Sequence, residues 1–154
     1  MTNSKKSSPS VELPFNLLVE NECPPVSVEH LPCIVVGKSY RVENPPLFLK
    51  HLSVGDVISV VRADNGNVAS WSHISMSKNT TIWLLRTAKT EGLAEALSKL
   101  RSLGCHTVQL PEYGCYSIDV PEICAINDVD ECLSRLDTTT LAIAYPSFRH
   151  SDGK

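Results

Sequence analysis

The 154-residue sequence has no apolar run near the length that a membrane-spanning helix requires. Its first ten residues are polar and carry Lys5 and Lys6, and no apolar stretch follows that could form the core of a signal peptide. We therefore expect a cytoplasmic protein without a membrane partner. Residues 1–10 also lack apolar periodicity, which predicts a disordered N-terminal tail.

The sequence also lacks the short motifs that indicate familiar enzymes. It contains no H-E-x-x-H, G-x-S-x-G, G-x-x-x-x-G-K-[ST] or G-x-G-x-x-G segment. The five histidines have no metal-ligand spacing, and the adjacent Cys105 and His106 would point to opposite faces of a strand. We therefore predict a binding protein that is not an enzyme and needs no metal or cofactor.

Close cysteine pairs are absent too, although the chain has six cysteines. None forms a C-x-x-C pair, the spacing typical of zinc sites, and the expected cytoplasm keeps thiols reduced. We expect six reduced thiols that pack as small apolar residues. The cysteines are Cys23, Cys33, Cys105, Cys115, Cys124 and Cys132.

The net charge of −3 disfavours nucleic acid as the main partner, and the charge is unevenly distributed. Residues 1–104 carry 11 Lys and Arg against 9 Asp and Glu. Residues 105–140 carry seven acids and a single base, a balance of −6, and residues 141–154 return +1. This acidic third indicates either a surface for a basic partner or a solvated face with helix-capping acids.

Residues 11–76 predict a β-rich part without helices. Asn65-Gly66 predicts a tight turn between its last two strands. Short strands separated by regular turns are typical of a small barrel or a strongly curved sheet, so we predict a β-barrel-like part. The predicted extended segments are residues 11–20, 30–36, 39–43, 57–62 and 68–76.

Residues 80–146 predict alternating strands and helices. Thr90 should open a first helix that Gly104 ends, and Asn127 or Asp128 should cap a second. The resulting order is that of a ferredoxin-like βαββαβ unit, whose helices cover one face of an antiparallel sheet. We therefore expect an α+β protein in which the β-barrel-like part packs on this unit, followed by a tail. The predicted strands span residues 80–86, 106–110, 116–120 and 141–145, and the tail spans residues 147–154.

Apolar matching within this unit predicts a hairpin in which Leu110 lies opposite Tyr116. Cys105 and Cys115 would then lie at opposite ends of the hairpin, about 15–20 Å apart at ~3.3 Å per residue, too far to share a zinc ion. Strand 80–86 is apolar on both faces, so the sheet needs cover on the side away from the helices. We expect the β-rich part to supply it, and a partner protein is the alternative.

Several short segments, in their order along the chain, resemble a bacterial family of domains of unknown function, numbered 4265. The resemblance covers roughly residues 12–145 and implies no enzyme chemistry that could be assigned to a residue. Small acidic bacterial proteins of this sort are often immunity proteins, which bind and block a cognate toxin, although a fold alone does not give a function. The segments are Tyr40–Pro46, Leu52–Ile58, Thr80–Leu84, Leu103–Cys105 and Tyr116–Pro121.

We therefore predict an immunity or inhibitor protein that occludes a basic, nuclease-type toxin through its acidic third. An active site that holds nucleic acid is basic, and complementary charge speeds association. The alternative is a regulatory or small-ligand-binding module with a site between the two parts. The predicted contact residues are Glu112 and Tyr113 at the hairpin tip, and Asp128, Asp130 and Glu131 in the first turn of the second helix.

Overall fold

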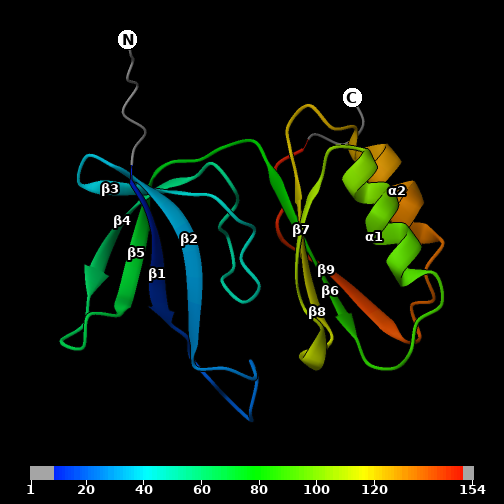
Figure 1. The fold of residues 1–154 in the computed structure, drawn as a ribbon, viewed down its shortest axis with the longest axis horizontal. Coiled ribbons are helices and arrows are strands. Elements are labelled where there is room, and N and C mark those ends of the chain that lie inside the picture. Colours follow the sequence, from blue (N-terminus) through cyan, green and yellow to red (C-terminus); the bar gives the residue numbers. More distant parts are fainter. Residues whose placement is uncertain (1–8, 151–154) are drawn as a thin grey trace. The chain divides into compact units, whose positions relative to one another are not determined.

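The computed structural model describes residues 9–150. Residues 1–8 and 151–154, which belong to the two predicted tails, lie outside the described residues. The chain divides into two compact units (Figure 1). The first comprises the residues up to Glu43 together with Gly55–Met76, and the second comprises Asn44–Val54 together with the residues from Ser77 onward. No helix within residues 9–150 is long and apolar enough to cross a membrane.

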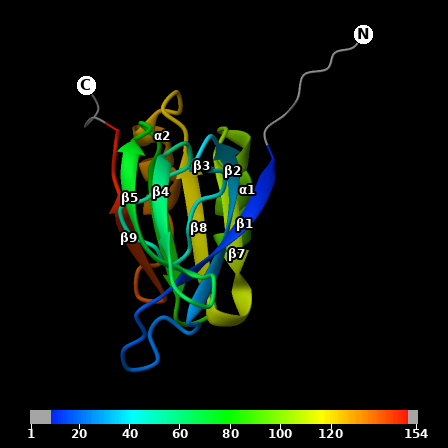
Figure 2. The ribbon, with the colours of Figure 1, turned by 90° about the vertical axis from the view of Figure 1, so that its left-hand side faces the viewer.

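Within the described residues, the first unit contains five strands, each antiparallel to the next along the chain. A short parallel contact between Phe15 of the first strand and Val68 of the fifth closes the ring of strands. Figure 2 shows β1 beside β2 and β4 beside β5. The strands are β1 (Ser10–Asn16), β2 (Val28–Val36), β3 (Ser39–Val42), β4 (Val57–Arg62) and β5 (Val68–Ser75).

Alternate residues along these strands form the core of the first unit. Leu13 and Phe15 of β1 and Leu31 and Cys33 of β2 are each at most 1% exposed. This is expected where every second side chain of a strand faces inward. Full burial of an apolar side chain of this size contributes about 1.5–3 kcal/mol to stability.

Two sequence predictions for the first unit have different outcomes. The tight turn at Asn65-Gly66 is confirmed, with a φ of 89° at Gly66 that glycine adopts without strain. The strand predicted over residues 11–20 is too long, because β1 ends at Asn16. The chain turns soon afterwards, where Asn21 and Glu22 both have positive φ angles.

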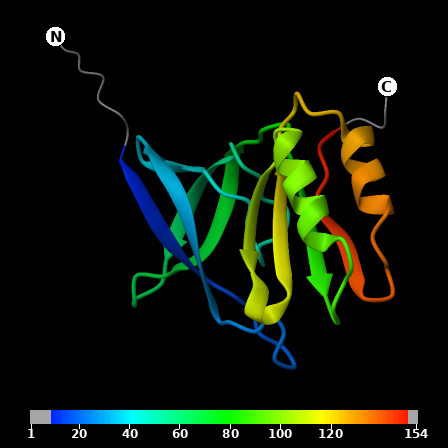
Figure 3. The same cartoon turned by 45° about the vertical axis from the view of Figure 1, so that its right-hand side comes forward.

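The second unit combines a four-stranded antiparallel sheet, in the order β7-β8-β6-β9, with two α-helices, within the described residues. The helices lie side by side on one face of the sheet (Figure 3). The predicted mixture of helices and antiparallel strands is confirmed. The elements are β6 (Thr80–Arg86), α1 (Leu93–Ser102), β7 (His106–Leu110), a 3₁₀ turn (Pro111–Tyr113), β8 (Cys115–Val120), α2 (Ile126–Ser134) and β9 (Leu141–Ser147).

The first helix of this unit begins later than predicted. Gly92, in the left-handed conformation with φ 79°, directly precedes Leu93. Thr90, the predicted start, lies before the helix. Its hydroxyl forms a hydrogen bond of 2.8 Å with the hydroxyl of Thr140. The predicted end is confirmed, since Gly104 has a φ of 103° and its N–H bonds the last turn of the helix.

The second helix begins before its predicted cap. Ala125 occupies the N-cap position, and its carbonyl accepts hydrogen bonds from the N–H groups of Asp128 and Val129. No side chain caps this helix. The prediction that Asn127 or Asp128 caps it is therefore wrong, and the Asp128 side chain is not used to start the helix.

The hairpin between β7 and β8 differs by one residue from its predicted register. Leu110 lies opposite Cys115 rather than Tyr116. The connection is a 3₁₀ turn, Pro111–Tyr113, followed by Gly114 in the left-handed conformation. These four residues replace the predicted five-residue turn, so every pair along the hairpin shifts by one.

The segment Asn44–Val54 packs with the sheet of the second unit. The Pro46 carbonyl accepts hydrogen bonds from Trp83 Nε1 and Ser117 Oγ, both at 2.7 Å. Trp83 and Ser117 are cross-strand neighbours, so they share one face of the sheet. The buried apolar residues of β6, Ile82 and Leu84, lie in the core cluster with the helices on the other face.

The same segment makes a second set of contacts at Ser53. Its hydroxyl lies 2.9 Å from that of Thr81 and donates to that of Ser147 at 2.8 Å. All three residues are at most 6% exposed. Buried polar groups need hydrogen-bond partners, and here the hydroxyls satisfy one another. Part of the cover that the second face requires thus comes from a segment in the first half of the sequence.

Candidate functional site

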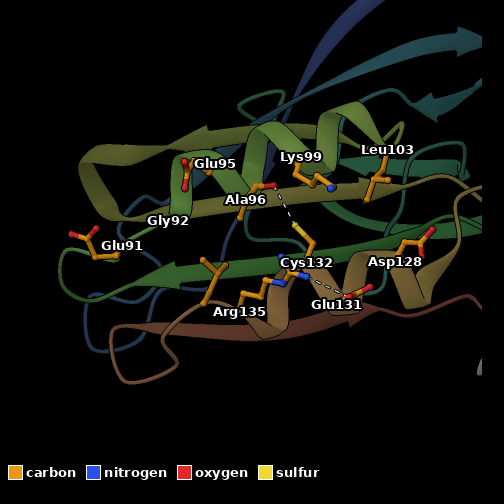
Figure 4. Close-up of a pocket in the computed structure, with 11 residues that line it drawn as sticks. Glu91, Gly92, Glu95, Ala96, Lys99, Leu103, Asp128, Glu131, Cys132 and Arg135 are labelled. Atoms are coloured by element: carbon orange, nitrogen blue, oxygen red, sulfur yellow. Dashed lines mark hydrogen bonds and ion pairs between the residues drawn. The ribbon is translucent and has the colours of Figure 1, made fainter.

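A groove of about 620 Å³ runs between α1 and α2 on the solvent-facing side of the helix pair (Figure 4). Glu95 and Lys99 line it from α1, and Asp128, Glu131 and Arg135 line it from α2. Residues three or four positions apart share one face of a helix, which brings these side chains into two facing rows.

The groove carries more acid than base. Four carboxylates and two cations line it, a balance of −2. Glu131 and Arg135 pair at 3.4 Å, but their side chains are 69% and 76% exposed, so the pair is weak. Within the described part of the chain, no ion pair engages the other three carboxylates. The carboxylates are Glu91, Glu95, Asp128 and Glu131, and the cations are Lys99 and Arg135.

Apolar side chains and a thiol form the floor of the groove. Cys132 Sγ lies 3.6 Å from the carbonyl oxygen of Ala96 and bridges the two helices (Figure 4). Burial raises the pKa of the Cys132 thiol, while the charges of Lys99 and Arg135 oppose that rise. The groove therefore offers a partner a neutral, partly apolar base between charged walls. The apolar lining residues are Ala96, Leu103 and Leu136.

The three predicted contact residues of α2 are exposed but lie on two sides of the helix. Asp128 and Glu131 line the groove toward α1. Asp130 accepts a hydrogen bond of 3.1 Å from the Tyr145 hydroxyl of β9. Burial and the neighbouring Asp130 carboxylate both raise the pKa of Tyr145, which keeps this donor protonated.

The other two predicted contact residues, Glu112 and Tyr113, are exposed in the 3₁₀ turn. The turn lies beside the end of β6, where the Arg86 N–H bonds the Gly114 carbonyl at 2.8 Å. The strand β8 leads from there to Val120, about 17 Å away at ~3.3 Å per residue, and α2 follows. The structure therefore does not bring the hairpin tip and the first turn of α2 together.

A buried carboxyl lies at the Val120 end of the same sheet. Asp119 is 4% exposed, and Asn79 Nδ2 donates to its Oδ1 at 3.0 Å. Burial raises the pKa of Asp119 to about 6, against the opposing effects of the Asn79 hydrogen bond and of His106 and His150. This carboxyl changes charge near neutral pH, which no feature of the sequence indicated.

In the first unit, a buried carboxyl contacts a partly buried histidine. The fully buried Asp56 lies 2.8 Å from His73 Nε2, and the His73 ring meets Trp71 edge to face at 5.0 Å. A carboxylate in this position fixes the orientation of an imidazole ring. Asp56, His73 and Trp71 therefore form a small connected cluster in the first unit.

The cysteines differ from the predicted set of small core residues. Cys33 and Cys105 are buried, and burial raises the pKa of each thiol to about 12. Cys23 is exposed, because it lies in the turn that follows β1. The expectation of core packing therefore fails for Cys23.

Comparison with known proteins places the chain in a family. A family model described as "Domain of unknown function (DUF4265)" matches residues 29–143. The chain belongs to the DUF4265 family. The matched region of this DUF4265 chain includes strands of both units, both helices and every groove-lining residue.

A solved structure has a similar fold to this DUF4265 chain. It is described as a novel crystal structure of a hypothetical protein from Neisseria gonorrhoeae. The two chains are 16% identical with a TM-score of 0.67, and the match covers 97% of this chain and 100% of that one. At this identity the likeness concerns the fold alone. No curated protein matches the chain.

Sequence reasoning missed two kinds of residue at the candidate site. Glu91 and Glu95 precede the acidic third, and only the pairing of two helices on one face places them opposite Asp128 and Glu131. Tyr145 was assigned to a strand, and no pattern linked it to the acids of α2. The acidic side chains at helical spacing before Gly104 were the available signal for the first pair.

Proposed function

We propose that this DUF4265 protein is an immunity-type inhibitor that binds a basic protein toxin. The acidic groove between α1 and α2 is its principal contact surface. The supporting observation is the excess of carboxylates around a partly apolar floor on two packed helices. A packed helix pair holds the backbone of most of these residues in place, so a partner can bind them without ordering a loop.

The proposed architecture is a β-barrel-like first unit followed by a ferredoxin-like second unit. The ring closure between β1 and β5 supports the first inference. The order β7-β8-β6-β9, with one helix after β6 and one after β8, supports the second. In this architecture both helices expose one long surface, which is where the groove lies.

The charge pattern of the groove fits a nuclease-type toxin. A site that binds nucleic acid presents Lys and Arg to phosphate groups. The four carboxylates around the groove offer the opposite charge. Complementary charge raises association rates toward ~10⁸–10⁹ M⁻¹s⁻¹ at low salt, which suits the rapid capture of a catalytic poison. Glu112 and Tyr113 are a separate proposed contact for a partner large enough to reach the hairpin tip.

The test combines partner capture with charge neutralisation in the groove. The tagged protein would be cross-linked in its source cell, and partners identified by mass spectrometry would be expressed and titrated by calorimetry. Changing Glu95 and Glu131 to Gln and Asp128 to Asn should weaken binding roughly tenfold, at about 0.5 kcal/mol for each exposed charge. It should also reduce the salt dependence of the affinity.

The matched control removes the same charge from the first unit. Glu12, Glu20 and Glu22 are exposed, and their change to Gln should alter affinity less than twofold. Equal losses for the groove and control variants would show that only net charge matters, which contradicts a groove-centred interface. Failure to recover any basic protein partner would contradict the inhibitor function itself.

A further inference from the structure

An aromatic pair lies on the surface of the second unit beside α2. Tyr145 of β9 and Phe148 just after it are 44% and 48% exposed. Their ring centroids are 5.7 Å apart and their planes meet at 78°, so the edge of one ring is directed at the other. The Tyr145 hydroxyl donates to Asp130 Oδ1 at 3.1 Å, which places a carboxylate at the end of the pair.

These three groups are not part of the apolar core. The buried cluster of the second unit includes Leu141 and reaches Ile143 at its edge, but it does not include Tyr145 or Phe148. Large half-exposed aromatic side chains are over-represented at binding hot spots. The pair is therefore available to a partner, and the hydrogen bond to Asp130 orients the Tyr145 ring.

The negative charge of this patch favours a cationic ligand. The faces of aromatic rings carry partial negative charge, and Asp130 adds a full one. The nearest cation along the chain, Arg149, already donates to the carbonyls of Ser77 and His51, at 2.8 and 3.3 Å. That guanidinium is therefore held by backbone oxygens of its own chain.

The geometry points to a seat for an arginine side chain of the partner, formed by Tyr145, Phe148 and Asp130. A guanidinium group is planar and can stack on a ring while it donates hydrogen bonds to a carboxylate, which an ammonium group cannot do as well. The inference rests on the proposed function in that the partner is a basic protein. The partner would insert an arginine side chain here, at a site separate from the groove.

The test is an NMR titration of the full chain with a tri-arginine peptide that is acetylated at its N-terminus and amidated at its C-terminus. The ring protons of Tyr145 and Phe148 and the amide of Asp130 should shift together and saturate with one dissociation constant. A tri-citrulline peptide has a similar shape without the charge, and it should produce no saturable shift at these residues. Equal shifts with both peptides would overturn the inference.

Substitutions separate the seat from general acidity. Phe148→Leu keeps an apolar side chain without a ring, and Asp130→Asn removes the charge, so each should weaken peptide binding about two- to fivefold. The matched control is Ile123→Ala, which removes another exposed apolar side chain, 94% exposed, beside an acid, Glu122. This control should leave the dissociation constant unchanged. If Phe148→Leu and Asp130→Asn weaken binding no more than Ile123→Ala does, the seat does not exist.

The outcomes for the seat and for the inhibitor function can be told apart. A basic partner whose binding depends on the groove but not on Phe148 or Asp130 would leave the proposed function intact and overturn the seat. Saturable arginine binding at Tyr145 and Phe148, without any basic partner in the source cell, would support the seat and contradict the proposed function. Backbone NMR spectra of each variant check that it is folded before affinities are compared.

Discussion

The two faces of the four-stranded sheet are held by different physical forces. On the helix side, Ile82 and Ile118 are fully buried among the apolar residues of α1 and α2. On the other side, Trp83 and Ser117 donate to the Pro46 carbonyl. Apolar packing tolerates small changes of shape, whereas each hydrogen bond on the second face requires one particular partner atom. Alternate side chains of β6 and β8 therefore stabilise the fold in different ways, by apolar packing on the helix side and by hydrogen bonds on the other side.

The largest expected effect comes from truncating the helix-side face. Ile118→Ala removes a fully buried side chain and leaves a cavity, which should lower the free energy of unfolding by about 2–5 kcal/mol. Urea denaturation measures this loss. The adjacent Ser117→Ala, on the opposite face, is the comparison, and an equal or larger loss there would show that the two faces do not differ as described.

The next largest effect should come from the buried carboxyl on the second face, and it should depend on pH. The pKa of Asp119 is raised to about 6 by burial, so the folded protein holds its proton more tightly than the unfolded chain does. This carboxyl costs little below about pH 4, and the cost grows between about pH 4 and pH 6 and then levels off. At about 1.4 kcal/mol per pKa unit, the full cost above pH 6 is on the order of 3 kcal/mol.

Asp119→Asn keeps an oxygen acceptor for Asn79 and cannot ionise. Relative to the unmodified protein, this variant should gain up to that amount between pH 4 and pH 7.5, measured by urea denaturation at each pH. The exposed Asp64→Asn is the control for a general change of charge. A stability difference that stays flat or runs in the opposite direction would contradict the burial of an ionisable Asp119.

A smaller effect should sharpen the account of the polar face. Trp83→Phe and Ser117→Ala each remove one of two donors to the Pro46 carbonyl, and each should cost about 1 kcal/mol. The double variant should cost more than the sum, because only then is a buried acceptor left without either donor. A double-mutant cycle by thermal or urea unfolding measures the coupling, and strict additivity would show that the shared carbonyl is not the link.

The smallest effect is expected at the groove. Glu131→Gln breaks its exposed pair with Arg135, and such pairs contribute about 0.3–0.5 kcal/mol. The melting temperature should therefore hardly change. A loss above 1 kcal/mol would mean that the groove charges hold the helices together, which would remove the reason to regard them as available to a partner.

The helix-side face was largely predictable from sequence, and the second face was not. The helical spacing of Val129 and Leu133 is typical of the buried face of a helix, and both are at most 2% exposed. No periodic pattern marks Pro46, because its role depends on a carbonyl that every residue possesses. The register of the hairpin was missed for a related reason, since a turn of four rather than five residues leaves the apolar pattern unchanged.

The candidate site shows the same limit. The exposure of Asp128 and Glu131 follows from their places between the apolar residues of a helix. Their apposition to Glu95 depends on how two helices pack, and the contact of Asp130 with Tyr145 depends on a neighbouring strand. Charge density along the chain located the acidic third but could not show that the predicted contact residues lie in three different places.

The segment Asn44–Val54 sets an order of events during synthesis. Its Ser53 hydroxyl bonds to that of Ser147, 94 residues further along the chain. At roughly 5–20 residues per second, the ribosome needs about 5–20 s to make the intervening chain. During that interval β6 and β8 are made, but β9, which carries Ser147, does not yet exist. The chain therefore cannot complete its folding piece by piece from the N-terminus, and its last strand is needed to fix residues made long before it.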